Sequence, residues 1–148
     1  DGADEVDPRL RMIKGKGGAL VRERIVAHAS TRNIFLVGED KLVDRLGARS
    51  PLPIAVMAFG LASVRDKLAN FGLNGVVRRT LDGQLFLTDN ASLILACTLG
   101  DGVDVEKLAA ELDSTPGVLD HGLFLDEADE VLVETAEGIT RMTPAAVP

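Results

Sequence analysis

The segment Lys14-Gly15-Lys16-Gly17-Gly18-Ala19-Leu20-Val21-Arg22-Glu23 is a glycine-rich turn that leads directly into a predicted helix. The glycines let the backbone approach a ligand closely and adopt dihedral angles closed to other residues. The first amide N–H groups of the helix have no partner within it, and its dipole favours negative charge at this end. We therefore expect this segment to bind a phosphate, or to stabilise a negative oxygen that forms during a reaction.

Glu23 is the most informative residue of this helix. At about 100° per residue it shares an arc with Ala19 and Val26, whereas Arg24 and His28 share a different, polar face. An acid within an apolar arc, close to an anion-binding helix start, is a candidate catalytic carboxylate. The alternative is a surface ion pair with Arg22 or Lys16, an interaction that contributes little to stability.

Acidic residues upstream of the glycine-rich turn favour the catalytic interpretation. The stretch Asp1-Gly2-Ala3-Asp4-Glu5-Val6-Asp7 places four acids in seven positions. Together with Lys14-Gly15-x-Gly17-Gly18-Ala19-Leu20 and Arg22-Glu23, Asp1-Gly2-Ala3-Asp4-Glu5 resembles the signature of ribose-5-phosphate isomerase, type A. The match is long and gapless, and the spacing from Asp4 to Lys14 and on to Glu23 is similar to that of the family.

Composition sets wider limits on the protein. With 148 residues, 46% of them hydrophobic, the chain can bury a core as one domain or two small ones. A net charge of −7 disfavours nucleic acid and anionic membranes as partners, and an aromatic content of 3% disfavours base stacking. The single cysteine, Cys97, lies in an apolar run, so we expect an inert buried thiol, which fits a cytoplasmic location.

The ends of the chain suggest a fragment. The sequence has no initiator Met and starts inside a motif, so we expect it to lack the N-terminal part of a longer protein. No apolar run approaches the roughly 20 residues of a membrane-spanning helix.

Alternating helices and strands predict an α/β fold. We expect a helix from about 18 to 29, an apolar strand over 33–37, and a short helix that ends at Leu46. This order suggests a Rossmann-like doubly wound sheet, in which ligands bind at the carboxyl ends of the strands. Residues 1–50 and 127–148, including a strand pair around Glu137-Gly138, are assigned to this domain, with residues 143–148 as a tail.

The prolines of Ser50-Pro51-Leu52-Pro53 mark a boundary, after which the pattern changes. Strands over 54–58, 75–81, 84–88, 92–98 and 118–121 and helices over 61–71 and 103–112 are predicted, with a hairpin at Asp82-Gly83. This βαββαβ-like order suggests that residues 51–126 form a small ferredoxin-like α+β domain inserted into the larger one.

Two further stretches of the small domain are similar to the isomerase family: Thr88-Asp89-Asn90, and Pro116-Gly117-Val118 followed by Gly122-Leu123-Phe124. We expect Asp89-Asn90 to form a turn rather than a site. The chain departs from the family pattern at Ala55, Ala58, Ala91 and Ala96, which affects local turns and the subunit interface rather than the chemistry.

The chemistry that the family resemblance implies is interconversion of ribose 5-phosphate and ribulose 5-phosphate in the pentose phosphate pathway. An aldose–ketose isomerase needs one base to move a proton between adjacent carbons, and donors to hold the enediolate oxygen. The resemblance implies Glu23 as the base and Lys41 as a substrate- or phosphate-binding lysine. The remaining predicted substrate-binding residues flank the turn or belong to it: Asp1, Gly2, Ala3, Asp4, Lys14, Gly15, Lys16 and Gly17.

We expect no cofactor and no metal site, and the resemblance implies a homodimer or homotetramer. The family also uses a Thr/Ser-rich phosphate loop from the N-terminal portion, so we expect the 148-residue chain alone to turn over little or no substrate. Two alternatives remain at this point. One is a non-catalytic sugar-phosphate sensor, and the other is an interaction or regulatory module centred on residues 51–126.

Overall fold

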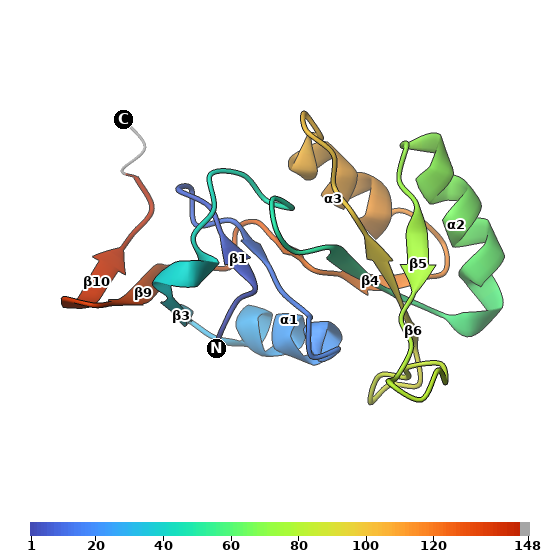
Figure 1. Ribbon diagram of the computed structural model, residues 1–148, viewed down its shortest axis with the longest axis horizontal. Helices are drawn as coiled ribbons and strands as arrows, with labels where there is room; N and C mark the ends of the chain where they lie inside the picture. The colour runs from blue at the N-terminus through green and yellow to red at the C-terminus, as the bar shows by residue number, and fades with distance from the viewer. Residues whose placement is uncertain (146–148) are drawn as a thin grey trace.

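The computed structural model describes residues 1–145 and confirms a mixed α/β fold. Figure 1 shows a left-hand part built from short sheets and one helix, and a right-hand part in which two helices cover a sheet. Among the described residues, no helix is both long enough and apolar enough to cross a membrane.

Two three-stranded sheets form the left-hand part. The first has the order β1-β2-β8 and is antiparallel, with strands Glu5–Val6, Met12–Ile13 and Leu123–Phe124. The second has the order β10-β9-β3, with strands Gly138–Met142, Glu130–Thr135 and Ile34–Gly38. Strands β3 and β9 are parallel although about ninety residues separate them, so the C-terminal strand pair joins the sheet of β3. Asp1 also lies beside β3, since the Leu36 N–H donates to the Asp1 carbonyl at 2.8 Å.

The right-hand part contains β4 (Leu52–Val56), α2 (Leu61–Asn70), β5 (Gly75–Val77), β6 (Leu93–Cys97), α3 (Val105–Asp113) and β7 (Val118–His121). Its sheet is antiparallel with the order β5-β6-β4-β7, which is the order expected for the predicted βαββαβ module. The predicted module is thus confirmed as an arrangement of elements. The domain boundaries after residues 50 and 126 remain predictions.

Alternate side chains of β4 and β6 point to opposite faces of the sheet and pack in two different layers. Ile54, Val56 and Leu95 face the layer of α2 and α3. On the opposite face, Ala55 and Ile94 pack against Leu20, the first residue of α1 (Leu20–Ala29). The helix that follows the glycine-rich turn is therefore fixed against the sheet of the small module.

The predicted helix up to Leu46 is wrong. The chain forms only a single 3₁₀ turn, η1 (Glu39–Lys41), and then extends, with the Val43 N–H donating to the Val6 carbonyl. The buried carboxylate of Glu5 accepts the next free amides, those of Gly47, Arg49 and Ser50, at 2.6, 2.7 and 2.6 Å. The pairing of Leu42 and Val43 with Val6 ends the 3₁₀ turn, and Glu5 fixes the segment that follows.

Other boundaries differ by a few residues. Helix α3 begins at Val105 because the carboxylate of Asp104 caps the Glu106 and Lys107 amides. The predicted strand over 84–88 is wrong: beyond Val77 the two limbs of the hairpin meet only in an isolated bridge between Arg79 and Leu85. Asp89-Asn90 forms the expected turn, which continues into Ala91 at φ 57°.

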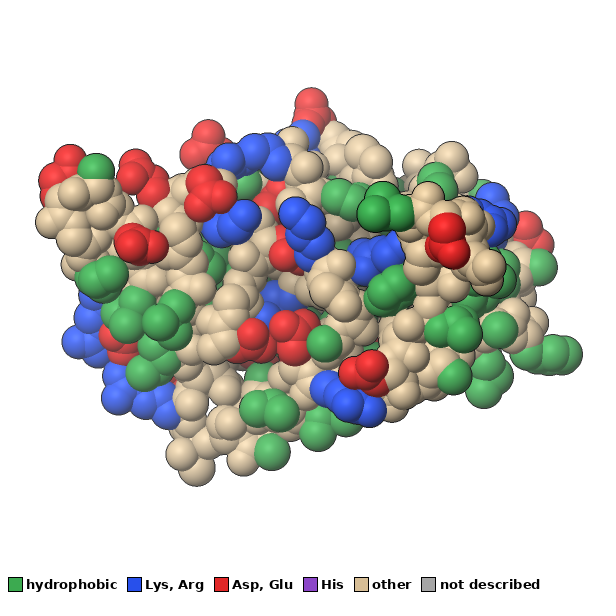
Figure 2. All heavy atoms as spheres, turned by 60° about the horizontal axis from the view of Figure 1, so that its bottom comes forward, with side chains coloured by type: hydrophobic (Ala, Val, Ile, Leu, Met, Phe, Trp, Pro, Cys, Tyr) green, Lys and Arg blue, Asp and Glu red, His purple; other side chains and the backbone are tan. Residues whose placement is uncertain are grey.

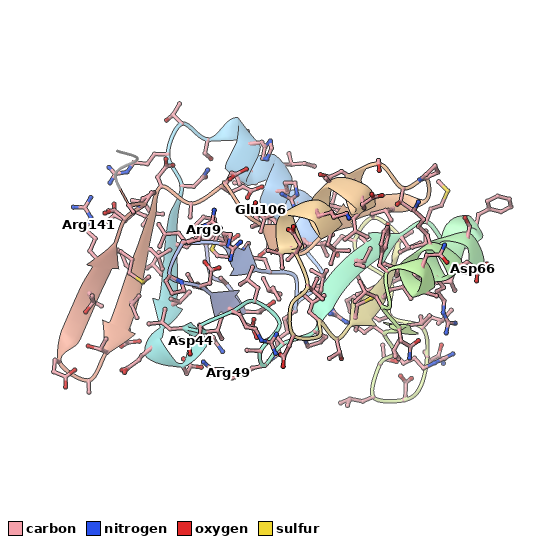
Figure 3. All side chains as sticks on the ribbon, turned by 90° about the horizontal axis from the view of Figure 1, so that it is seen from above. Arg9, Asp44, Arg49, Asp66, Glu106 and Arg141 are labelled. Atoms are coloured by element: carbon pink, nitrogen blue, oxygen red, sulfur yellow. The ribbon has the colours of Figure 1, made fainter. Side chains whose placement is uncertain are left out.

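Contacts between the two parts extend beyond α1. Figure 3 shows Arg9, from the loop between β1 and β2, beside Glu106 in the first turn of α3. The guanidinium and the carboxylate are 3.2 Å apart, and Arg11 reaches the same carboxylate at 3.4 Å. A short connection, η2 (Ala58–Gly60), joins β4 to α2.

Candidate active site

A small cavity of about 240 Å³ lies where the glycine-rich turn meets the first residues of the chain. Every predicted site residue except Lys41 lines this cavity: Asp1, Gly2, Ala3, Asp4, Lys14, Gly15, Lys16, Gly17 and Glu23. On the face shown in Figure 2, acidic side chains gather beside a central hollow, with basic side chains nearby. The sequence motifs thus converge in space.

Lys14 lies at the end of β2 and is the most deeply placed of the charged residues in the cavity. Its side chain is only 2% exposed, and its Nζ lies 3.1 Å from Asp1 Oδ2 and 3.2 Å from Glu23 Oε1. Nζ also donates to the Gly2 carbonyl and lies 5.1 Å from the ring centroid of Phe35. Burial lowers the pKa of Lys14, and the nearby Glu23 carboxylate opposes this shift.

Glu23 lies one turn into α1, and its two carboxylate oxygens have different surroundings. Oε1 accepts a hydrogen bond from Lys14 Nζ. Oε2 is buried, and within residues 1–145 no other buried side-chain nitrogen or oxygen lacks a hydrogen-bond partner. A surface ion pair with Arg22 or Lys16 is therefore not the role of Glu23, since Arg22 instead lies 3.4 Å from Asp89.

The glycine-rich turn takes its shape from two residues in the left-handed region, Gly15 at φ 100° and Gly18 at φ 84°. Between them, the Lys16 N–H donates to Asp4 Oδ2 at 2.9 Å. This hydrogen bond joins the turn to Asp4 of the acidic N-terminal motif, and both residues line the cavity.

Two side chains of the small module hold the other side of this turn, and neither was predicted. Arg78 Nη1 donates to the Lys16 carbonyl at 2.8 Å and approaches the Gly15 carbonyl at 3.4 Å. The Phe86 ring lies so close to Gly18 that a Cβ there would be 2.7 Å from it. No local sequence signal marked these residues, because the contact joins parts of the chain more than sixty residues apart.

The sequence also did not predict the partners of Arg24, which was expected only to lie on a polar face of the helix. Its Nε donates to Asp120 Oδ1 at 2.7 Å, and its Nη2 donates to the His121 and Leu123 carbonyls at 2.8 and 2.9 Å. Its Nη1 pairs with Glu127. Arg24 therefore fastens α1, the helix that carries Glu23, to β7 and β8.

Lys41 lies in η1, after β3, and does not line the cavity. Its Nζ is 3.1 Å from Asp40 Oδ2, and its side chain is 39% exposed. A role for Lys41 in binding substrate or phosphate stays a prediction.

A larger cavity of about 650 Å³ lies along another side of α1, with Arg24, His28, Asp113 and His121 in its lining. Both ring nitrogens of His121 are occupied: Nε2 is 3.0 Å from Asp113 Oδ1, and Nδ1 accepts from the Leu123 amide at 3.2 Å. Burial lowers the pKa of His121. Across residues 1–145, no group of three or more His, Cys, Asp or Glu side chains is placed to hold a metal ion.

Comparisons with known proteins agree with the motif-based resemblance. The family model for ribose 5-phosphate isomerase A (phosphoriboisomerase A) matches residues 1–138. Ribose-5-phosphate isomerase A of Roseiflexus sp. (strain RS-1) is 46% identical over 142 residues, which cover 96% of this chain and 61% of the relative.

Solved structures give the same result. A structure of D-ribose-5-phosphate isomerase in complex with phospho-erythronic acid superposes with a TM-score of 0.91 at 37% identity, covering 97% of this chain and 63% of that one. Ribose 5-phosphate isomerase A from Methanocaldococcus jannaschii gives 0.90 at 34% identity, with 97% and 64% coverage. The chain thus spans less than two thirds of the length of these relatives. By sequence and by structure, the chain belongs to the ribose 5-phosphate isomerase A family.

Proposed function

We propose that the full-length protein interconverts D-ribose 5-phosphate and D-ribulose 5-phosphate through an enediolate, with Glu23 as the general base. The observation that carries this proposal is the buried Glu23 Oε2, which has no hydrogen-bond partner within residues 1–145. An unsatisfied buried acceptor costs about 1–3 kcal/mol. A lone pair kept free at this cost is available to accept a proton from a substrate carbon.

The proposed reaction moves one proton between two carbons and one between two oxygens, and it joins no substrate carbon to the protein. Glu23 removes the proton from C2 of the open-chain aldose, and the electron pair of that C–H bond forms the C1–C2 double bond of the enediolate. The carbonyl oxygen at C1 gains the negative charge. Return of the proton from Glu23 to C1, with transfer of the O2 hydroxyl proton to O1, yields the ketose.

Lys14 and the turn supply the groups that stabilise the negative oxygen in this scheme. The Lys14 ammonium is fixed by Asp1 and Glu23, so little reorganisation is needed when charge develops. Because burial lowers the pKa of Lys14, its ammonium is a stronger acid than an exposed lysine and donates a stronger hydrogen bond to an oxyanion. The Gly17 amide of the turn completes the set, because the Lys16 and Gly18 amides already donate to Asp4 and to the Gly15 carbonyl.

The acids at the rim have a separate proposed role. Asp1 and Asp4 hold sugar hydroxyls and assist ring opening, and Lys41 binds substrate or phosphate. One of the solved relatives was captured with phospho-erythronic acid, a small acid that carries a phosphate. This supports a substrate of sugar-phosphate size, and no cofactor or metal has a part in the scheme.

The two alternatives have less support. A sugar-phosphate sensor gains nothing from a buried, unpaired carboxylate oxygen, and the family that the chain matches is one of isomerases. An interaction module restricted to residues 51–126 does not account for the cavity, because all of its lining residues lie in the first part of the chain.

The test compares wild-type full-length protein with Glu23→Gln. The amide keeps size and polarity but is not a base, so ribulose 5-phosphate formation should slow by roughly a hundredfold or more while substrate still binds. Glu134→Gln is the matched control, because Glu134 is exposed on β9. Full activity in Glu23→Gln would transfer the base role to Asp1 or Asp4.

The same assay on the 148-residue chain alone tests whether these residues suffice for turnover. We expect little or none. Substantial turnover by this chain would show that the described residues already form a complete site.

We also propose that the full-length protein is a cytoplasmic homodimer or homotetramer that binds neither nucleic acid nor membranes. Exposed apolar side chains support self-association: Phe59 is 98% exposed, and Leu81, Leu87 and Met57 are also exposed. Hydrophobic side chains stand out on the right-hand part of the molecule in Figure 2. A monomeric mass by light scattering would reject this oligomeric proposal.

A further inference from the structure

Arg78 reaches the glycine-rich turn from a fixed position on the small module. It directly follows β5, and its backbone is bonded on both sides: its N–H donates to the Ile94 carbonyl at 2.8 Å, and its carbonyl accepts from the Phe86 amide at 3.1 Å. The guanidinium lies 5.4 Å from the Phe86 ring centroid. The side chain is thus supported by the module before it contacts the turn.

The guanidinium holds carbonyl oxygens of the turn. Nη1 donates to the Lys16 carbonyl at 2.8 Å and is 3.4 Å from the Gly15 carbonyl. Burial lowers the pKa of Arg78, and the Asp4 carboxylate opposes this shift. The contact with the Gly15 carbonyl is partly buried and the one with the Lys16 carbonyl is exposed. Both are charge-assisted, and such hydrogen bonds are stronger than those between neutral groups.

Because a peptide unit is planar, a contact that fixes the direction of its carbonyl also fixes the direction of its N–H. In a trans peptide the N–H points opposite to the C=O of the same unit. The unit that joins Gly15 to Lys16 directs its carbonyl toward Arg78 and its N–H to Asp4 Oδ2, at 2.9 Å. The next unit directs the Lys16 carbonyl toward Arg78, so its N–H, that of Gly17, points away from Arg78.

The Gly17 N–H is the group that this arrangement leaves available. Gly17 lines the small cavity together with Glu23, and no residue within 1–145 accepts its N–H. A glycine-rich turn is conformationally permissive, and a flip of the Lys16–Gly17 peptide unit would replace the Gly17 N–H by the Lys16 carbonyl oxygen, which repels an anion.

We propose that Arg78 is a positioning residue that prevents this flip and keeps the Gly17 N–H directed at the negative oxygen of the reaction intermediate. This inference rests on the isomerase function proposed above. Both parts of the fold then contribute to the proposed active site, because the base lies on α1 and the residue that orients the amide belongs to the small module.

The test uses the full-length protein with Arg78→Met, which keeps an apolar stem over Phe86, and Arg78→Lys, which keeps the charge but not the planar fork. Arg79→Met is the matched control, since Arg79 is exposed and, within residues 1–145, its side chain bonds only the Gly83 carbonyl of its own hairpin. Readouts are kcat and KM for ribose 5-phosphate, inhibition by phospho-erythronic acid, and the melting temperature.

An amide that acts only on the developing oxyanion should affect kcat rather than KM. Loss of one such donor lowers kcat by about 10²–10³-fold, so we expect a drop of about 10–100-fold in Arg78→Met, with KM changed by less than about threefold. Arg78→Lys should lose less. Inhibition by phospho-erythronic acid, whose carboxylate resembles the enediolate, should weaken in parallel with kcat.

Three results would overturn the inference while leaving the proposed function intact. If kcat in Arg78→Met equals that of Arg79→Met, Arg78 does not position the amide. A raised KM at unchanged kcat would make Arg78 a substrate-binding residue instead. If Arg78→Met does not fold, a wild-type kcat in Arg78→Lys rejects the role. An inactive wild-type protein would reject the proposed function itself, and the inference with it.

Discussion

Replacing Arg24 by Met is predicted to destabilise the protein strongly, because Arg24 is the cation that two buried acids share. The side chains of Asp120 and Glu127 are each 8% exposed, and that of Arg24 is 21% exposed. Removing one partner of a buried ion pair costs about 3–5 kcal/mol, since the remaining charge is left in a poor solvent. We expect a loss of about this size in the free energy of unfolding at pH 7.

The loss should depend on pH in a defined direction. Burial raises the pKa of Asp120, and the ion pair with Arg24 opposes that shift. A carboxyl whose pKa is higher in the folded state than in the unfolded state makes folding less favourable as pH rises through that window. Without Arg24 the pKa of Asp120 rises further, so the deficit of Arg24→Met should shrink when the pH falls from 7 to 5.

Urea unfolding of the full-length protein at pH 7 and pH 5, followed by circular dichroism, measures both effects. Arg22→Met is the control on the same helix, because the Arg22 side chain is 59% exposed and pairs with an exposed Asp89. This control should change stability by less than about 0.5 kcal/mol. A deficit below about 1 kcal/mol for Arg24→Met, or one that does not change with pH, would refute the reasoning.

Two further predictions concern buried groups away from the cavity. Glu5→Gln leaves one acceptor oxygen where the carboxylate accepts the amides of Gly47, Arg49 and Ser50, so we expect unfolding to become easier by about 2–4 kcal/mol. An unchanged urea midpoint would contradict this. Burial raises the pKa of the Cys97 thiol to about 11, so a thiol reagent at pH 8 should label the protein in denaturant and leave the native protein unlabelled. Rapid labelling of the native protein would show that Cys97 is accessible.

Local sequence patterns were sufficient for the main elements. Glycine and proline punctuation, together with apolar periodicity, placed α1, β3, α2, β6, β7 and the β9–β10 pair within a few residues of their observed bounds. The motif spacing also anticipated that Asp1, Asp4, Lys14 and Glu23 would meet at one cavity. These features depend on residues that are close in the sequence or that follow a fixed spacing, so the local sequence is enough to predict them.

The tertiary structure decided the partners of the charged residues. Val6 accepts the Val43 amide where a helix was predicted, Glu5 accepts the Gly47 amide 42 residues away, and Arg24 bonds a carboxylate 96 residues further along the chain. Arg78 holds the turn from a distance of 62 residues. Helix periodicity indicates which face a side chain occupies but not which charge or carbonyl lies opposite it. The sequence therefore indicated the main elements and the proposed base, whereas the supports of the site were decided only when the small module packed against α1.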